Sequence, residues 1–182
     1  GMNRASWDLT HQGATRIPGS TNDAGNVNVG PKVAPGEYRV RLTVGGETYE
    51  QALTVLPDPR SDAPIENILE QISFLLDIRD RITSISDDAV LIRATREQLN
   101  AHQARLGDDP RAERLLSLGK SVTEALRKVE LDIYSPDAQV NYDILAGRHG
   151  GAKLYSRYGW LYKSSLGHTG PPTQGMTEVD AE

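Results

Sequence analysis

The chain lacks cysteine, has few aromatic residues, and contains no long apolar run. The absence of cysteine excludes a disulfide framework, a thiolate metal site and a cysteine nucleophile. With no stretch of about 18 apolar residues, we expect no membrane span. The first residues also lack the basic and then apolar pattern of a signal peptide. The 25 acidic residues exceed the 20 basic ones. Nucleic acid is therefore not an expected partner, because phosphate binding requires a dense lysine and arginine surface.

Charge and composition change together near residue 60. Residues 1–60 are electrically neutral and rich in glycine, threonine and valine, whereas residues 61–182 carry the whole net charge of −5. Three prolines in the segment from Leu56 to Pro64 predict a stiff, extended connection. We therefore expect a β domain over residues 1–58, a proline-rich linker over 59–64 and a helical bundle over 65–182. The fold class is predicted to be α+β, mainly α.

The segment 36–44 alternates apolar and polar residues, which is typical of a half-buried strand. Gly45 and Gly46 follow, and they predict a tight hairpin turn with a return strand over 48–55. A third strand is expected over 4–9, with Trp7 as its main buried side chain, and residues 10–35 are expected to form a long loop. Three strands are too few for an immunoglobulin-like sandwich, which needs about seven. The sheet's apolar face must then be covered by the helices, by another chain or by strands upstream of residue 1.

Several of these residues resemble the C-terminal region of one family of large bacterial secreted proteins. Gly1-Met2-Asn3-Arg4 and Trp7-Asp8-Leu9 resemble its G-x-N-R-x-x-W-D-L strand. Gly30-Pro31 with 35–42 resembles its G-P-x-x-x-P-G-x-Y-x-V-R-L hairpin, and 57–60 resembles its exit linker. The family carries sortilin-type, BNR-repeat β-propellers and is labelled as glycosyl hydrolases.

The resemblance implies a partial Ig-like sheet followed by a helical segment, a secreted or periplasmic location, and a propeller-bearing parent chain as partner. The family's hydrolase activity would reside in the propeller, which these 182 residues do not contain. The resemblance therefore implies no catalytic residue and no cofactor for this chain.

Apolar residues recur at three- and four-residue steps from Ile65 to Leu106, in a segment free of glycine and proline. This spacing predicts one long helix of roughly 63 Å. Asp62 is its expected N-cap and Gly107 its expected end. The alternative is two helices, the second capped by Ser86.

Further helices are expected along the rest of the chain, arranged as an antiparallel bundle. The second begins at Asp109-Pro110 and ends at Ser135-Pro136. A third is expected over 138–166, although its glycines weaken it, and Thr173 is the expected cap of a last segment. The apolar stripe of the second helix consists of Leu115, Leu118, Val122, Leu126, Val129 and Ile133.

No residue pattern predicts a catalytic or metal site. The histidines, at positions 11, 102, 149 and 168, match no metal-binding spacing. The pairs Asp87-Asp88 and Asp108-Asp109 are interpreted as helix caps, because adjacent helical side chains diverge by about 100°. The glycine-rich segment 147–153 lacks the spacing of a phosphate-binding loop and predicts a helix break or a close helix crossing.

The aromatic residues Tyr155, Tyr158, Trp160 and Tyr162 lie among lysines and an arginine and are candidate stacking residues for a ligand. Because Tyr155, Tyr158 and Tyr162 share one helical face, core packing is the favoured interpretation.

The leading hypothesis is a non-catalytic accessory or interaction module of a secreted propeller protein. The alternatives are a carbohydrate-binding or cell-surface adhesion module and, with less support, a hydrolase domain. Because an incomplete sheet leaves an edge and an apolar face, a homodimer through the sheet edge or the long helix is also expected.

Overall fold

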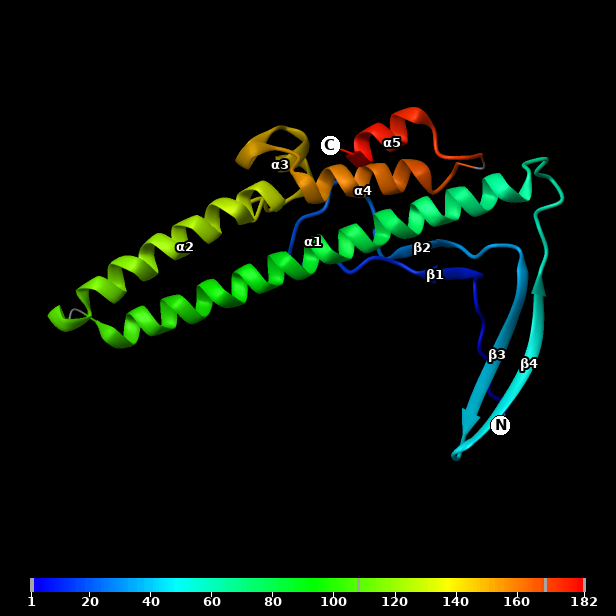
Figure 1. Ribbon diagram of the computed structural model, residues 1–182, viewed down its shortest axis with the longest axis horizontal. Coiled ribbons are helices and arrows are strands. Elements are labelled where there is room, and N and C mark those ends of the chain that lie inside the picture. The colour runs from blue at the N-terminus through cyan, green and yellow to red at the C-terminus, as the bar shows by residue number, and fades with distance from the viewer. Residues whose placement is uncertain (1, 108, 169, 182) are drawn as a thin grey trace.

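The computed structural model describes residues 2–107, 109–168 and 170–181 (Figure 1). Its described part is mainly helical and includes two antiparallel sheets of two strands each. This agrees with the predicted α+β, mainly α class. The strands are β1 (Thr10–Gln12), β2 (Val29–Lys32), β3 (Gly36–Val44) and β4 (Glu47–Val55). The α-helices are α1 (Ile65–Leu106), α2 (Glu113–Ile133), α3 (Asn141–Leu145), α4 (Leu154–Ser165) and α5 (Gln174–Ala181). Short 3-10 turns, η1 (Pro110–Ala112) and η2 (Arg148–Gly150), precede α2 and α4.

The β3–β4 hairpin forms as predicted, from Gly36 paired with Val55 to Val44 paired with Glu47. Gly45 and Gly46 adopt φ of 60° and 88°, which favours glycine and closes the turn. The hairpin projects away from the helices (Figure 1), and most of both its faces are exposed.

The predicted strand over residues 4–9 is absent from the described residues, and Trp7 is 44% exposed rather than buried. Asp8 accepts a hydrogen bond from the backbone N–H of Thr10, and the Trp7 indole N–H donates to the Thr10 carbonyl. These local bonds turn the chain, so that the strand begins only at Thr10 and pairs with β2 instead of with the hairpin.

The expected loop over residues 10–35 is the largest error of the sequence analysis, because this segment contains β1 and β2 and supplies part of the core. Ile17 and Val27 are each 1% exposed and belong to one cluster with Ile78 and Ile82 of α1. The Ala14 backbone N–H donates to the Val27 carbonyl at 2.9 Å, which closes the segment on itself.

Helix α1 is continuous over 42 residues and ends before Gly107, as predicted. The predicted capping roles of Asp62 and Ser86 are not observed. Asp62 does not cap it, since Pro64 occupies the N-cap position without a side-chain hydrogen bond. Ser86 lies buried in mid-helix, and its hydroxyl donates to the carbonyls of Ile82 and Thr15. It therefore joins α1 to the N-terminal segment instead of starting a second helix.

The predicted helix over 138–166 is broken into α3, η2 and α4. Gly147, Gly150 and Gly151 adopt positive φ, and so does His149 between them. The backbone therefore leaves helical geometry over several consecutive residues. The alternative of a helix break at the glycine-rich segment is thus confirmed, and α4 begins only at Leu154.

The second helix also differs from expectation. A 3-10 turn precedes it, capped by the Asp109 side chain, which accepts from the Arg111 backbone N–H; Asp108 lies outside the described residues. Much of its apolar stripe is exposed instead of buried: Leu115 is 62% exposed, Leu118 60% and Val129 50%. At the C-terminal end, Thr173 accepts from the Met176 backbone N–H and caps α5 as predicted.

Matched alanine substitutions distinguish the core segment from the exposed hairpin. We expect Ile17→Ala to lower the free energy of unfolding by about 3 kcal/mol, because it opens a cavity in the core. Leu42→Ala, at a position that is 59% exposed, should change it by less than about 0.5 kcal/mol. Urea denaturation followed by circular dichroism measures both, and equal effects would contradict this division of buried and exposed residues.

Candidate functional site

The four candidate aromatic residues lie on α4 but do not form one platform. Tyr155 is 2% exposed and Tyr162 1%, and both belong to the core. The Tyr162 hydroxyl donates to the Val29 carbonyl at 2.8 Å, and burial raises the pKa of Tyr162 to about 12. Tyr158 is partly buried, and its hydroxyl donates to the Asp180 carbonyl at 3.3 Å. Tyr162 thus holds β2, and Tyr158 holds α5, against α4.

Trp160 is the exposed member of the set, at 42%. Its indole N–H donates to Asp23 Oδ2 at 3.2 Å, and the Lys163 ammonium lies 4.8 Å from its ring centroid. The ring borders an open, mostly apolar groove of about 530 Å³ between α4 and α5, which Met176 and Val179 also line. Of the four predicted stacking residues, Trp160 is the one whose ring is exposed beside a groove.

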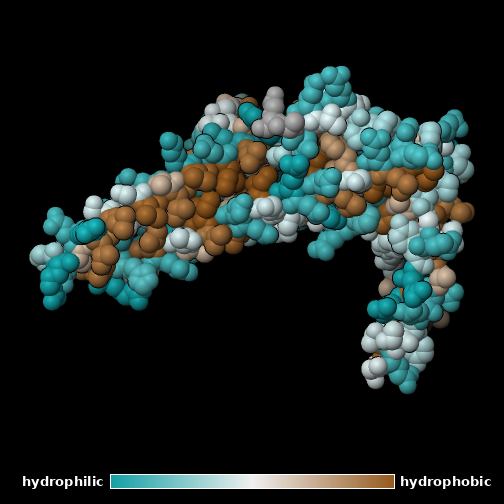
Figure 2. Space-filling view, in the orientation of Figure 1, coloured by the Kyte–Doolittle hydropathy of each residue, from teal (hydrophilic) through white to brown (hydrophobic). Residues whose placement is uncertain are grey.

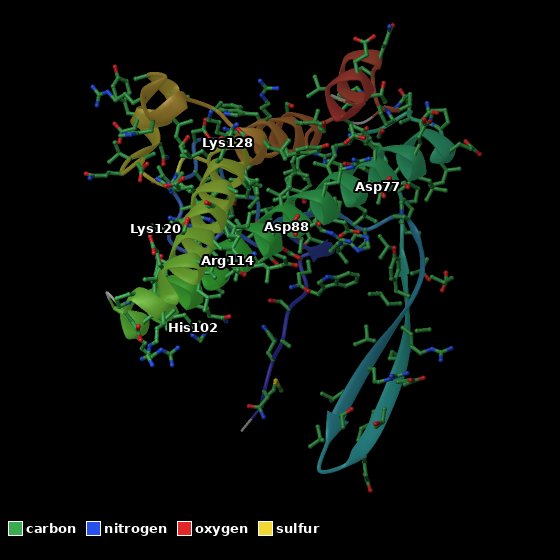
Figure 3. All side chains as sticks on the ribbon, turned by 60° about the vertical axis from the view of Figure 1, so that its left-hand side comes forward. Asp77, Asp88, His102, Arg114, Lys120 and Lys128 are labelled. Carbon is green, nitrogen blue, oxygen red and sulfur yellow. The ribbon has the colours of Figure 1, made fainter. Side chains whose placement is uncertain are left out.

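The other chemistry-bearing side chains are dispersed. Among the described residues, no group of three or more His, Asp or Glu side chains could hold a metal ion. Figure 3 shows Asp77, Asp88 and His102 spread along α1, with Arg114, Lys120 and Lys128 spread along α2. Asp87 and Asp88 are exposed in mid-helix, so their predicted capping role is wrong.

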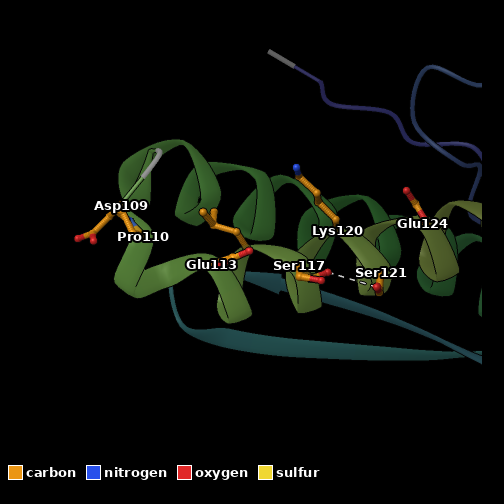
Figure 4. Close-up of a pocket in the computed structure, with 8 residues that line it drawn as sticks. Asp109, Pro110, Glu113, Ser117, Lys120, Ser121 and Glu124 are labelled. Carbon is orange, nitrogen blue, oxygen red and sulfur yellow. Dashed lines mark hydrogen bonds between the residues drawn. The ribbon is translucent and has the colours of Figure 1, made fainter.

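The pockets also lack converging chemistry. The shallow depression in Figure 4, of about 560 Å³, begins at Asp109, ahead of η1, and follows the polar side of α2 to Glu124. The hydrogen bond drawn there joins the Ser121 hydroxyl to the Ser117 carbonyl. A second cavity, of about 440 Å³, lies where the base of the β3–β4 hairpin meets α1, and its walls include Val55, Ile72 and Leu75. Gln71 lines it, and the Gln71 amide donates to the Ser165 carbonyl at 2.9 Å.

A buried carboxylate, which the sequence analysis did not single out, joins α1 to α2. Glu130 is 2% exposed and accepts hydrogen bonds from the Tyr134 hydroxyl at 2.6 Å, from Arg127 at 3.2 Å and from Arg96. Arg93 lies 3.5 Å from the same carboxylate and donates to the Tyr134 hydroxyl at 2.7 Å. The i, i+3 and i, i+4 spacing of Arg127, Glu130 and Tyr134 was the available sequence signal.

The contacts within this cluster shift the pKa values of Glu130 and Tyr134. Burial in itself raises the pKa of Glu130, but the hydrogen bonds from Tyr134 and Arg127 and the charges of Arg96 and Arg127 outweigh it. The pKa of Glu130 therefore lies below its ordinary value, and Glu130 is ionised at neutral pH. Burial, together with the hydrogen bond to Glu130, raises the pKa of Tyr134 to about 12. The cluster is a stabilising ion-pair network between helices.

Two projecting parts of the molecule expose apolar faces. On the β3–β4 hairpin, one face carries Arg39, Arg41 and Glu50 in ion pairs, while the other carries Val40, Leu42 and Tyr49, which are 50–59% exposed. Trp7 packs edge-on against Tyr38 at the hairpin base, with ring centroids 5.8 Å apart. The second apolar face runs along α1 and α2 (Figure 2). The helices thus leave the outer part of the hairpin's apolar face uncovered.

Comparison with family models, with curated proteins and with solved structures gives no match to this chain. In addition, none of the described helices is both long and apolar enough to cross a membrane.

Removal of the Glu130 charge tests the network. We expect Glu130→Gln to lower the free energy of unfolding by about 3 kcal/mol at pH 7, because it leaves the surrounding arginines without their shared counter-charge. Glu97→Gln, at an exposed position on α1, is the matched control and should have little effect. Equal stability of the Glu130 variant and the wild-type protein in urea denaturation would contradict the role of the cluster.

The same variant has a predictable pH dependence. Because the folded pKa of Glu130 lies below its unfolded value of about 4.5, the stabilisation is complete above that pH and is lost as the pH falls through the lower folded pKa. The stability difference between wild-type protein and Glu130→Gln should therefore be constant from pH 7 to pH 5.5 and shrink below about pH 4.5. A difference that grows on acidification would have the wrong sign.

Proposed function

We propose that this chain is a non-catalytic interaction module, an accessory part of a larger secreted protein. The observation that carries the proposal is the pair of apolar faces on the projecting β3–β4 hairpin and on the α1–α2 arm. Contiguous exposed apolar surface of this kind marks sites of protein association. An enzyme would instead be expected to gather its polar groups in a concave pocket.

The distribution of polar groups supports the same proposal. The buried carboxylate, Glu130, is fully engaged by arginines and a tyrosine and is closed off from any substrate. The two aspartates and the histidine that Figure 3 labels do not converge. The strand and hairpin motifs at residues 1–9 and 30–42 support a parent protein of the propeller-bearing, glycosyl hydrolase type, in which this chain would serve as spacer or docking element.

A turnover assay tests the non-catalytic assignment. Purified chain incubated with pooled aryl glycosides and aryl esters should release no product above the buffer rate. Reproducible turnover that disappears when one exposed carboxylate, such as Asp88→Asn, is changed would contradict the proposal. Asp77→Asn, on the same helix, is the control for non-specific effects of charge removal.

Trp160 and its groove favour carbohydrate binding as a second candidate function. A half-exposed indole beside an open groove can stack against a sugar ring. If this surface binds glycans, a glycan array should give signals that Trp160→Ala abolishes, whereas the exposed apolar variant Leu145→Ala retains them. Glycan signals that survive Trp160→Ala would exclude this site.

A further inference from the structure

The C-terminal part of α1 and the whole of α2 form a two-helix arm, defined here as residues 90–106 and 113–133. In Figure 1 the arm extends beyond the end of α4, so that these two helices lack the third layer that covers the middle of α1. The helices contact each other through Arg96 with Glu130 and through Gln103, whose amide lies against Gly119. Each helix therefore uses only one side for its neighbour.

A second side of each helix in the arm is apolar and exposed. On α2 the apolar side consists of Leu115, Leu118, Val122 and Val129, which are separated by three, four and seven residues and therefore share one side of the helix. This side lies about a quarter-turn around the helix from Gly119 and Glu130. They are 38–62% exposed. On α1, Leu91 is 65% and Leu106 38% exposed. Leu99 lies eight residues after Leu91 and a heptad before Leu106, so the three leucines fall within about a quarter-turn of one another around α1.

These stripes form one surface, which we call the arm face: Leu91, Leu99, Leu106, Leu115, Leu118, Val122 and Val129. On each helix the apolar stripe lies about a quarter-turn from the contact with the other helix, measured in the same direction around the helix. Because the helices are antiparallel, the two stripes lie on the same side of the pair, and Figure 2 shows the apolar band running along the arm across both helices. The opposite side is polar, as the residues around the Figure 4 depression show. The arm is therefore amphipathic as a unit.

The arm face has the size and shape of an interface between helical hairpins. Side chains at these exposures sum to several hundred square ångströms, which is more than scattered surface residues provide. With a polar rim, the patch approaches the roughly 800 Å² per partner of a standard interface. A helical hairpin with one flat apolar face is half of a four-helix bundle.

Two charged residues at the edge of the arm face indicate what kind of surface would bind there. Arg114 and Asp132 lie 18 residues, or five full turns, apart on α2, so they occupy the same edge of the apolar stripe. Both are exposed, and neither forms an ion pair within the described part of the chain. They are equidistant from Thr123, near the middle of the stripe. A two-fold axis there would place each Arg114 opposite an Asp132, whereas a parallel arrangement would oppose like charges.

We propose that the arm face binds the same face of a second copy of this chain, with α2 antiparallel to α2, to form a four-helix bundle. Such an isologous contact requires a self-complementary patch, which the apolar stripe with its two opposite charges provides. This inference rests on the proposed function and names its partner. It leaves the β3–β4 hairpin free for a different contact.

Sedimentation equilibrium of the full chain tests the proposal. The wild-type chain should be a dimer at micromolar concentration, and Leu118→Lys should be monomeric at the same concentration. Ser117→Lys adds the same charge at the adjacent position on the polar side of α2 and should remain dimeric. Circular dichroism of each variant reports whether its helices are retained. A monomeric wild-type chain, or a folded Leu118→Lys dimer, would overturn the proposal.

Charge reversal tests the antiparallel arrangement independently. Arg114→Glu and Asp132→Arg should each weaken dimerisation roughly tenfold, because each creates like-charge contacts twice per dimer. The double variant exchanges the two charges and should restore wild-type affinity. Failure of the double variant to recover would overturn the antiparallel pairing. Turnover in the substrate assay would instead contradict the non-catalytic function, so the two failures are distinguishable.

Discussion

The structure depends on the burial of one side of α1 between Leu75 and Ala89. Leu75, Ile78, Ile82 and Ala89 are at most 4% exposed, and on this strip the N-terminal segment meets α4 and its tyrosines. The strip is contiguous because its apolar residues recur at helical spacing, so a single rigid helix presents them all in one direction. The N-terminal segment and α4 pack against this strip, whereas the β3–β4 hairpin and the α1–α2 arm extend beyond it.

This distribution of layers explains why the polar groups that join elements are buried while apolar faces are exposed elsewhere in the molecule. Buried polar groups hold elements together: Ser86 joins α1 to Thr15, and Glu130 joins α1 to α2. Away from the strip, the β3–β4 hairpin and the α1–α2 arm project with apolar faces that no described segment covers. Surfaces of that kind suit contacts with other protein surfaces, and this is the physical basis of the proposed interaction role.

The candidate site could be anticipated only in part. The helical spacing of Tyr155, Tyr158 and Tyr162 favoured packing, and the structure places Tyr155 and Tyr162 in the core, which leaves Trp160 as the accessible ring. The Glu130 cluster escaped prediction because two of its arginines come from α1, more than thirty residues away, and their distance to Glu130 depends on how α1 and α2 pack. The exposed stripe of α2 was visible in the sequence, but amphipathic spacing alone does not say whether a neighbouring helix covers it.

The sequence by itself determined the elements whose geometry is local. The alternation in 36–44 with Gly45-Gly46 specified the hairpin, and 42 residues without glycine or proline favoured one continuous helix over two, because backbone propensity and side-chain period act over neighbouring residues. Only the tertiary structure decided the role of residues 10–33. Ile17 and Val27 stand among glycines, asparagines and prolines without any period, and contacts with α1 and α4 alone make them core. Burial is a property of the assembled layers, so no local pattern records it.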